Sequence, residues 1–315
     1  MRRLKRVLRW IGVGLLALFV ALTLASLLFN AVTSGRDEAA SKLYAGPYVQ
    51  VDGTELAYRA WGSRGTPILL LGGFIEPAWV WHRVGPLLGR THRVYALDLP
   101  PFGYSQRRGP YTLAHWAELV RGFEQRLGLH RPVLVGHSLG AAVVVLLAAG
   151  RPGSTRGIML LDGDARPGGG GASFLSHLLV PPWYTSIYRI ATDWDWLLRK
   201  GLRGAWGTGT PPFSKAFIEE WEQPFRVGGT AAAFASMLGH GIQGVSVSTI
   251  QSVKVPALVA WGSHDTVDPM SAGRQTAALL HAPFVEIPGA GHLSMLARPA
   301  LVARAVDRVA AKTIR

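Results

Sequence analysis

The 315-residue chain contains no cysteine. This absence excludes a disulfide framework and metal sites built on thiolates, and it would suit an oxidising environment. Charged residues make up only 17% of the chain, less than the usual quarter, and acidic residues are the scarcer kind, with 19 Asp and Glu against 33 Lys and Arg. Because the basic residues of this +14 chain are scattered, not grouped in blocks with interleaved aromatics, we expect no dedicated nucleic-acid surface.

Charge is missing altogether from Trp10–Phe29. Such a run, at a helical rise of about 1.5 Å per residue, is long enough to cross a bilayer. Five basic residues precede the run: Arg2, Arg3, Lys5, Arg6 and Arg9. The charges that follow it nearly cancel one another. The positive-inside rule therefore predicts a single-pass signal anchor over residues 1–35, with a cytoplasmic N-terminus and the remaining chain on the extracytoplasmic side of the membrane. Cleavage is disfavoured because Leu28-Phe29-Asn30 offers no small-x-small exit.

Past a polar linker, the sequence alternates short apolar runs with segments of helical length. Two alternating runs flank Asp52-Gly53, which predicts a hairpin over residues 48–58. Continuous apolar runs indicate strands buried on both faces, and they occur at residues 68–71, 94–97, 133–135, 158–161, 257–261 and 284–287. Helices are expected at 78–88, 113–127, 139–149, 269–280 and 293–311. The predicted fold is α/β, a mostly parallel central sheet with helices on both faces.

This rhythm breaks between Ala165 and Val253. The break opens with Gly168–Gly171 and is dense in aromatic residues, among them Phe174, Trp183, Tyr188, Trp194, Trp221, Phe225 and Phe234. A segment of this length inside one connection should have its own structure. We therefore expect residues 165–253 to form a helical cap, inserted before the penultimate strands, over a core of residues 36–164 and 254–315.

The chemistry is indicated first by Gly136-His137-Ser138-Leu139-Gly140, which lies between a predicted strand and a predicted helix. A serine between two glycines at such a turn is typical of a nucleophile elbow, because the strained turn leaves no room for larger side chains. The backbone N–H of Leu139, at the helix start, is then a candidate donor to a developing oxyanion. Phe74, after Gly72-Gly73, is the candidate for the second N–H.

A serine hydroxyl needs a base and a group that orients the base. His292 follows the last predicted strand, at the sheet edge to which the elbow also points, and it is our candidate base. Asp265 follows the penultimate strand and is the first candidate for the orienting acid, with Asp268 in reserve. Asp162 and Asp164 could also reach a histidine. The side chain of His137, next to the serine, is expected to project elsewhere.

These residues give the chain a resemblance to the α/β-hydrolases, in particular to their capped, lipase/esterase-like members. The resemblance spans roughly Tyr48 to Ala311 and rests on Leu71-Gly72-Gly73-Phe74, Asp98 to Ser105, Gly136 to Gly140, Trp261 to Asp265 and Gly291-His292. Gly72 stands where the family often has His, and Pro101 where it often has Gly. The resemblance implies that Asp265 is the acid, and the serine at position 138 disfavours relatives with an aspartate nucleophile.

Together the observations predict a serine hydrolase that needs no cofactor and no metal. The expected substrate is a small ester with an apolar part, cleaved through an acyl-enzyme. An aminopeptidase, a thioesterase or a C–C bond hydrolase could use the same residues, and Asp193, Asp195, Glu219, Glu220 and Glu222 keep an aminopeptidase open. A membrane-tethered binding protein without catalysis is the alternative of another class.

Overall fold

The structure is a computed structural model that describes residues 2–167, 182–192, 195–239 and 243–311. Gly168–Gly171, Phe174, Asp193 and Trp194, which were singled out in the sequence, lie outside the described residues.

An eight-stranded sheet forms the centre, in the order β1-β2-β4-β3-β5-β6-β7-β8. β2 pairs antiparallel with β1 and β4, and the pairs from β4 through β8 are parallel. The strands are β1 (Tyr48–Val51), β2 (Thr54–Trp61), β3 (Pro67–Leu71), β4 (Arg93–Leu97), β5 (Val133–His137), β6 (Gly157–Leu161), β7 (Ala257–Gly262) and β8 (Phe284–Ile287). The predicted mostly parallel α/β sheet is thus confirmed, including the hairpin at Asp52-Gly53, where both residues have positive φ.

Helices cover both faces of the sheet. On β3, Leu69 and Leu71 belong to one core and Ile68 and Leu70 to the other, because alternate side chains of a strand point to opposite faces. The first core is closed by α4 (Leu113–Arg126), α5 (Leu139–Gly150), α11 (Val247–Gln251) and α12 (Met270–Leu279). The second is closed by the 3-10 helix η2 (Ala78–Trp81), α3 (Gly85–Leu88), α13 (Ser294–Ala297) and α14 (Pro299–Ala310). A short 3-10 helix, η3 (Pro152–Ser154), follows α5.

Two predicted helices are each divided in the structure. The helix expected at 78–88 consists of η2 and α3, and the one expected at 293–311 consists of α13 and α14. The second division falls at Pro299, which lacks an N–H and keeps Arg298 out of the helical region, at φ −136° and ψ 55°. Proline is then well placed at the first position of α14.

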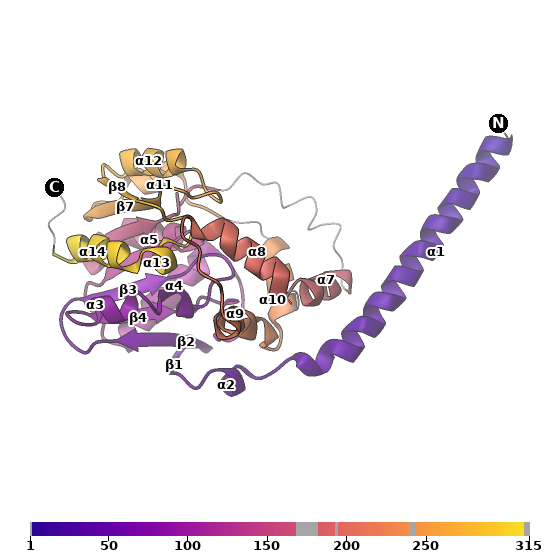
Figure 1. Cartoon of the computed structure of the whole chain (residues 1–315), viewed down its shortest axis with the longest axis horizontal. Helices are drawn as coiled ribbons and strands as arrows, with labels where there is room; N and C mark the ends of the chain where they lie inside the picture. The colour runs from indigo at the N-terminus through magenta and orange to yellow at the C-terminus, as the bar shows by residue number, and fades with distance from the viewer. Residues whose placement is uncertain (1, 168–181, 193–194, 240–242, 312–315) are drawn as a thin grey trace.

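Between β6 and β7 lies a mainly helical segment, residues 162–256, which we call the β6–β7 segment. It contains α7 (Trp183–Thr192), α8 (Asp195–Trp206), α9 (Lys215–Glu222), η4 (Gln223–Arg226), α10 (Thr230–Gly239) and α11. In Figure 1, α7 to α10 lie together beside the sheet, whereas α11 packs on the core against α5 and α12.

The N-terminal helix α1 (Arg2–Thr33) extends away from the rest of the molecule (Figure 1). Among the described residues, its Lys5–Thr33 portion is the one helix long and apolar enough to cross a membrane. Its C-terminal half packs against α7, and η1 (Ser34–Arg36) and α2 (Ala40–Leu43) lead from it to β1.

Candidate active site

Ser138 occupies a strained turn between β5 and α5. Its backbone has φ 49° and ψ −119°, a conformation that ordinary residues rarely adopt. The crowding around it explains the glycines: a Cβ on Gly136 would lie 2.3 Å from the carbonyl oxygen of Gly140, and one on Gly163 would lie 2.4 Å from that of Ser138. The sequence therefore folds here into the sharp turn that presents a serine at the carboxyl edge of the sheet.

His292 follows β8 and is hydrogen-bonded to Asp265, which follows β7. The distance from His292 Nδ1 to Asp265 Oδ2 is 2.8 Å, and the Asp265 side chain is fully buried. The other oxygen of Asp265 accepts the backbone N–H groups of Val267 and Asp268 at 2.8 and 3.0 Å. This carboxylate is therefore fixed in orientation, and it can hold the histidine ring with a proton on Nδ1 and the Nε2 lone pair exposed.

Asp268, the reserve candidate, makes no side-chain contact of this kind among the described residues. Its backbone N–H supports Asp265, and its carbonyl accepts Trp261 Nε1 at 3.3 Å. Burial raises the pKa of its carboxyl group. The geometry thus pairs Asp265, not Asp268, with the histidine.

The structure brings His292 next to the elbow. The rings of His137 and His292 have centroids 4.8 Å apart, and His137 Nε2 lies 2.7 Å from the carbonyl oxygen of His292. The hydrogen bonds of the described residues do not include one between Ser138 Oγ and the His292 ring, a contact that is often long in unliganded enzymes.

The loop between β3 and η2, residues 72–77, which we call the Phe74 loop, lies directly against Ser138. A Cβ on Gly73 would be 2.8 Å from the Ser138 Cβ, so only glycine lets this loop approach so closely. Within the loop, Gly73 N–H donates to Glu76 Oε2 at 2.7 Å and Glu76 N–H to the Gly73 carbonyl at 3.4 Å, and neither bond uses the N–H of Phe74. Leu139 is the first residue of α5, where a helix leaves N–H groups without an intrahelical acceptor. Both candidate oxyanion donors thus flank the serine.

Asp98 connects the start of η2 to the loop that contains Tyr104 and Ser105. Its carboxylate accepts the backbone N–H of Ala78 at 2.5 Å and of Tyr104 at 2.8 Å, and its backbone carbonyl accepts the Ser105 hydroxyl. Gly103 has φ 56°, and a Cβ there would lie 1.9 Å from the Asp98 carboxyl carbon. Burial raises the pKa of Asp98 to about 6. The Asp98–Ser105 motif therefore fixes η2, the element that follows the Phe74 loop.

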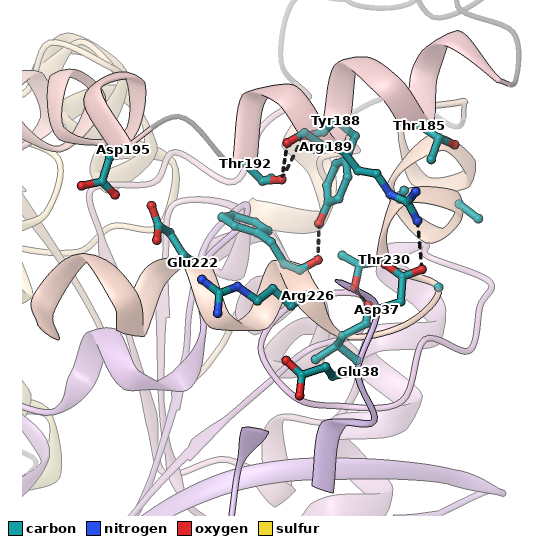
Figure 2. A pocket seen from close by; sticks show the side chains of 15 residues that line it. Asp37, Glu38, Thr185, Tyr188, Arg189, Thr192, Asp195, Glu222, Arg226 and Thr230 are labelled. Carbon is teal, nitrogen blue, oxygen red and sulfur yellow. Dashed lines mark hydrogen bonds and ion pairs between the residues drawn. The ribbon is translucent and has the colours of Figure 1, made fainter. Parts of the chain in front are cut away.

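Two hollows lie near these residues. An apolar cavity of about 450 Å³ reaches His292, and its walls come from the Phe74 loop, α7, α8 and α10, including Phe74, Tyr188, Leu197, Leu202 and Phe234. A second, more polar cavity of about 710 Å³ lies between α7, η4 and α10 (Figure 2) and shares Tyr188, Thr192 and Phe225 with the lining of the first. Of the three predicted catalytic residues, His292 lines the apolar cavity, and Ser138 and Asp265 line neither cavity.

Of the acidic residues that kept an aminopeptidase open, the four that the structure describes do not line the apolar cavity. Asp195 and Glu222 lie at one end of the polar cavity, as Figure 2 shows, where burial and then Asp195 raise the pKa of Glu222 to about 7. Glu220 pairs with Arg59 at 3.4 Å. Glu219 is likewise absent from the lining of the apolar cavity.

The remaining candidates have other partners. Asp164 forms an ion pair with Arg166 at 2.9 Å. Asp162 accepts the N–H of Gly262 at 2.7 Å, and its second oxygen lies 3.9 Å from His137 Nε2. Glu76 was not among the predicted site residues, but it binds His137 Nδ1 at 2.7 Å. A carboxylate between Phe74-Ile75 and Pro77-Ala78-Trp79 is the signal that could have revealed it, since a buried charge needs a partner.

Comparison with known proteins finds relatives over most of the chain. The family model described as alpha/beta hydrolase fold matches residues 66–299. The uncharacterized hydrolase YugF of Bacillus subtilis (strain 168) is 27% identical over 261 residues, which cover 80% of this chain and 93% of that protein. Among solved structures, a membrane phospholipase A described as a novel bacterial virulence factor matches with a TM-score of 0.70 and 25% identity over 99% of both chains. A thermophilic esterase from Thermogutta terrifontis matches with a TM-score of 0.68 and 25% identity, over 86% of this chain and 100% of that chain.

Proposed function

The chain belongs to the alpha/beta hydrolase family, and from this premise we propose that it is a serine hydrolase that cleaves carboxylic esters with an apolar part. The observation that carries the proposal is the hydrogen bond from His292 to the buried Asp265 beside the strained Ser138 turn, at the end of an apolar cavity. A hydrolase with this arrangement has a nucleophile, a base and an orienting acid in the order that the elbow requires.

In the proposed mechanism, His292 Nε2 takes the proton of the Ser138 hydroxyl as the oxygen attacks the ester carbonyl carbon. The resulting oxyanion accepts the N–H groups of Phe74 and Leu139, each worth about 10²- to 10³-fold in rate. His292 then gives the proton to the departing alcohol, which leaves an acyl-serine. Water, activated by the same histidine, releases the acid. Asp265 keeps the ring in the required tautomer and stabilises the imidazolium.

The apolar cavity favours esters over peptide substrates with a free ammonium. An aminopeptidase needs carboxylates near the bound amine, but Asp195, Glu219, Glu220 and Glu222 do not line this cavity. Glu76 does line it, but this carboxylate is only 5% exposed and is bonded to Gly73 and His137. Its walls supply aromatic and aliphatic contacts that suit an acyl chain. The esterase and the membrane phospholipase A among the similar structures support an ester substrate.

The position of α1 supports a lipid as the source of this ester. We propose that α1 anchors the chain in a membrane, with the N-terminus cytoplasmic, the remaining chain on the extracytoplasmic side and residues 165–253 acting as a cap. The Phe19 and Trp183 rings lie 4.9 Å apart, and the hydroxyl oxygens of Ser26 and Ser186 lie 2.6 Å apart, so α7 runs beside the anchor. Tyr188, on the same helix, lines the apolar cavity. The cavity wall is thereby held against the proposed anchor.

Replacing the nucleophile tests the proposal. Ser138→Ala should lower turnover of a short p-nitrophenyl ester by at least about 10³-fold, because the acylation path is lost. A fluorophosphonate should label the folded parent protein and the control Ser154→Ala, whose hydroxyl is exposed in η3, but not Ser138→Ala. Retention of most activity in Ser138→Ala would reject the assignment. No labelling of the folded parent would favour a binding protein without catalysis.

A further inference from the structure

Three buried ionisable side chains lie near Ser138 and have no part in the proton transfers described above. They are Glu76 in the loop after β3, His137 at the end of β5 and Asp162 after β6, with side chains 5%, 0% and 0% exposed. Buried charges are costly unless they are paired and hydrogen-bonded. We therefore ask what these three side chains contribute to the site.

The hydrogen bonds of His137 define its protonation. Nδ1 lies 2.7 Å from Glu76 Oε2, and Nε2 lies 2.7 Å from the carbonyl oxygen of His292. A backbone carbonyl and an ionised carboxylate can only accept hydrogen bonds. Since the same Glu76 oxygen also accepts the N–H of Gly73, the arrangement is satisfied when both ring nitrogens of His137 donate, which makes the ring an imidazolium.

The surrounding charges support this state. Burial alone would lower the pKa of His137, but the charge and hydrogen bond of Glu76, followed by Asp162 and the His292 carbonyl, raise it to about 9. Asp162 leaves one buried oxygen, Oδ2, without a hydrogen-bond partner, 3.9 Å from His137 Nε2. The other ionisable groups that act on this cluster are His292, Asp265 and Asp268.

The ring of His137 connects the loop of the proposed oxyanion donor Phe74 to the backbone of the proposed base His292. Through Glu76 it reaches Gly73, the residue before the Phe74 oxyanion donor, and through the other nitrogen it holds the backbone of the base. Three residues near His137 have strained backbone conformations, with φ of 58° at Ile75, 49° at Ser138 and 48° at Asp162. Such conformations persist only where surrounding bonds impose them, and for a β-branched residue such as Ile75 they are unusual.

We propose that His137 is a positioning residue that stays protonated throughout turnover and ties the Phe74 loop and the backbone of His292 to the Ser138 turn. This inference rests on the serine hydrolase function proposed above. The two ring N–H groups fix the distance between the oxyanion donor and the base, so that neither needs to be ordered when substrate binds. Glu76 supplies the negative charge that keeps the ring protonated.

Two substitutions of His137 test its two hydrogen bonds, to Glu76 and to the His292 carbonyl, separately. In His137→Asn the amide can still reach Glu76 but not the His292 carbonyl, whereas in His137→Gln it can reach the carbonyl but not Glu76. We expect each to lower kcat by about 10²-fold with little change in KM, because a small displacement of reacting groups has this effect. His82→Gln, at the end of η2 and outside the cluster, is the matched control and should keep parental kinetics.

Glu76→Gln tests the charge and keeps the fold. Its amide oxygen can accept both the Gly73 N–H and the His137 N–H, so the hydrogen bonds remain and only the negative charge is lost. In the parent, the protonated form of His137 exists below its raised pKa of about 9 and is lost as pH rises through that value. Removing the charge lowers this pKa, so the alkaline fall of kcat should move to lower pH, toward neutrality. A uniform loss at every pH would overturn the proposal.

Nitrogen NMR of histidine-labelled folded protein gives an independent readout. We expect His137, identified by the signal missing in His137→Gln, to carry protons on both ring nitrogens at neutral pH in the parent and also in Ser138→Ala. A single proton on this ring in the parent would overturn the inference. Because the measurement needs no turnover, it distinguishes failure of this inference from failure of the proposed function, which fluorophosphonate labelling reports.

Discussion

At the scale of single residues, the orientation of one carboxylate decides which aspartate can serve the base. Asp265 receives two backbone N–H groups on one oxygen and the histidine on the other, so its charge is fixed where the imidazolium would form. Asp268 contributes through its backbone N–H, which any residue except proline would supply. The two neighbours therefore have different roles, although the spacing of the sequence allows either.

Substituting each aspartate separates these roles. Asp265→Asn should lower kcat by about 10³- to 10⁴-fold, because the amide favours the wrong tautomer of His292. Asp268→Asn should cause a much smaller loss, since its side chain does not touch the ring among the described residues. Steady-state hydrolysis of a soluble ester measures both. A larger loss in Asp268→Asn would transfer the role of the acid to that residue.

How far the sequence predicts the site differs from residue to residue. Ser138, His292 and Asp265 each follow a buried strand, and parallel strands end at one edge, so their convergence can be inferred from apolar runs and glycines. The apolar neighbours of Glu76 indicate a buried carboxylate, but they do not identify its partner, because the course of this loop depends on tertiary contacts. His137 was expected only to project away from the serine. Its two partners come from segments 61 and 155 residues distant, which no local pattern relates.

At the scale of secondary structure elements, the apolar runs located the strands well because burial on both faces requires continuous apolarity. Helix ends were harder to predict. The segment 293–311 is apolar at helical spacing throughout, but Pro299 divides it. The pairing of α7 with α1 could not be predicted at all, since Ser26 and Ser186 are 160 residues apart and each is an ordinary helical serine.

The length of acyl chain that the site accepts is a property of the helices that enclose the apolar cavity. Each buried methylene contributes about 0.8 kcal/mol, so kcat/KM should rise with chain length until the cavity is full. Ala205, on α8, lines this cavity. Ala205→Leu should move the optimum to shorter chains, measured on a series of p-nitrophenyl esters.

The control for this substitution is Ala231→Leu on α10, which adds the same bulk to the polar cavity. It should leave the chain-length profile unchanged. An equal shift in both variants would mean that the apolar cavity does not hold the acyl chain.

At the scale of the whole molecule, the absence of cysteine makes the proposed topology directly measurable, because any introduced thiol is the only one. Lys254 lies exposed between α11 and β7, and Lys5 lies exposed in α1. In intact spheroplasts, a membrane-impermeant maleimide should label Lys254→Cys at once and Lys5→Cys only after permeabilisation. The reverse pattern would place the hydrolase domain in the cytoplasm. Release of an unanchored chain would indicate cleavage.

Within one turn, helix α7 contacts both α1 and the apolar cavity. Ser186 and Arg189 bond to Ser26, Asn30 and Thr33 of α1, while the intervening Tyr188 reaches the apolar cavity. These bonds couple the position of α7 to that of α1. If α1 sits in a bilayer as proposed, a change in lipid thickness that tilts this helix is passed through α7 to the wall of the apolar cavity. The composition of the surrounding membrane would then act on turnover without any ligand binding to the protein.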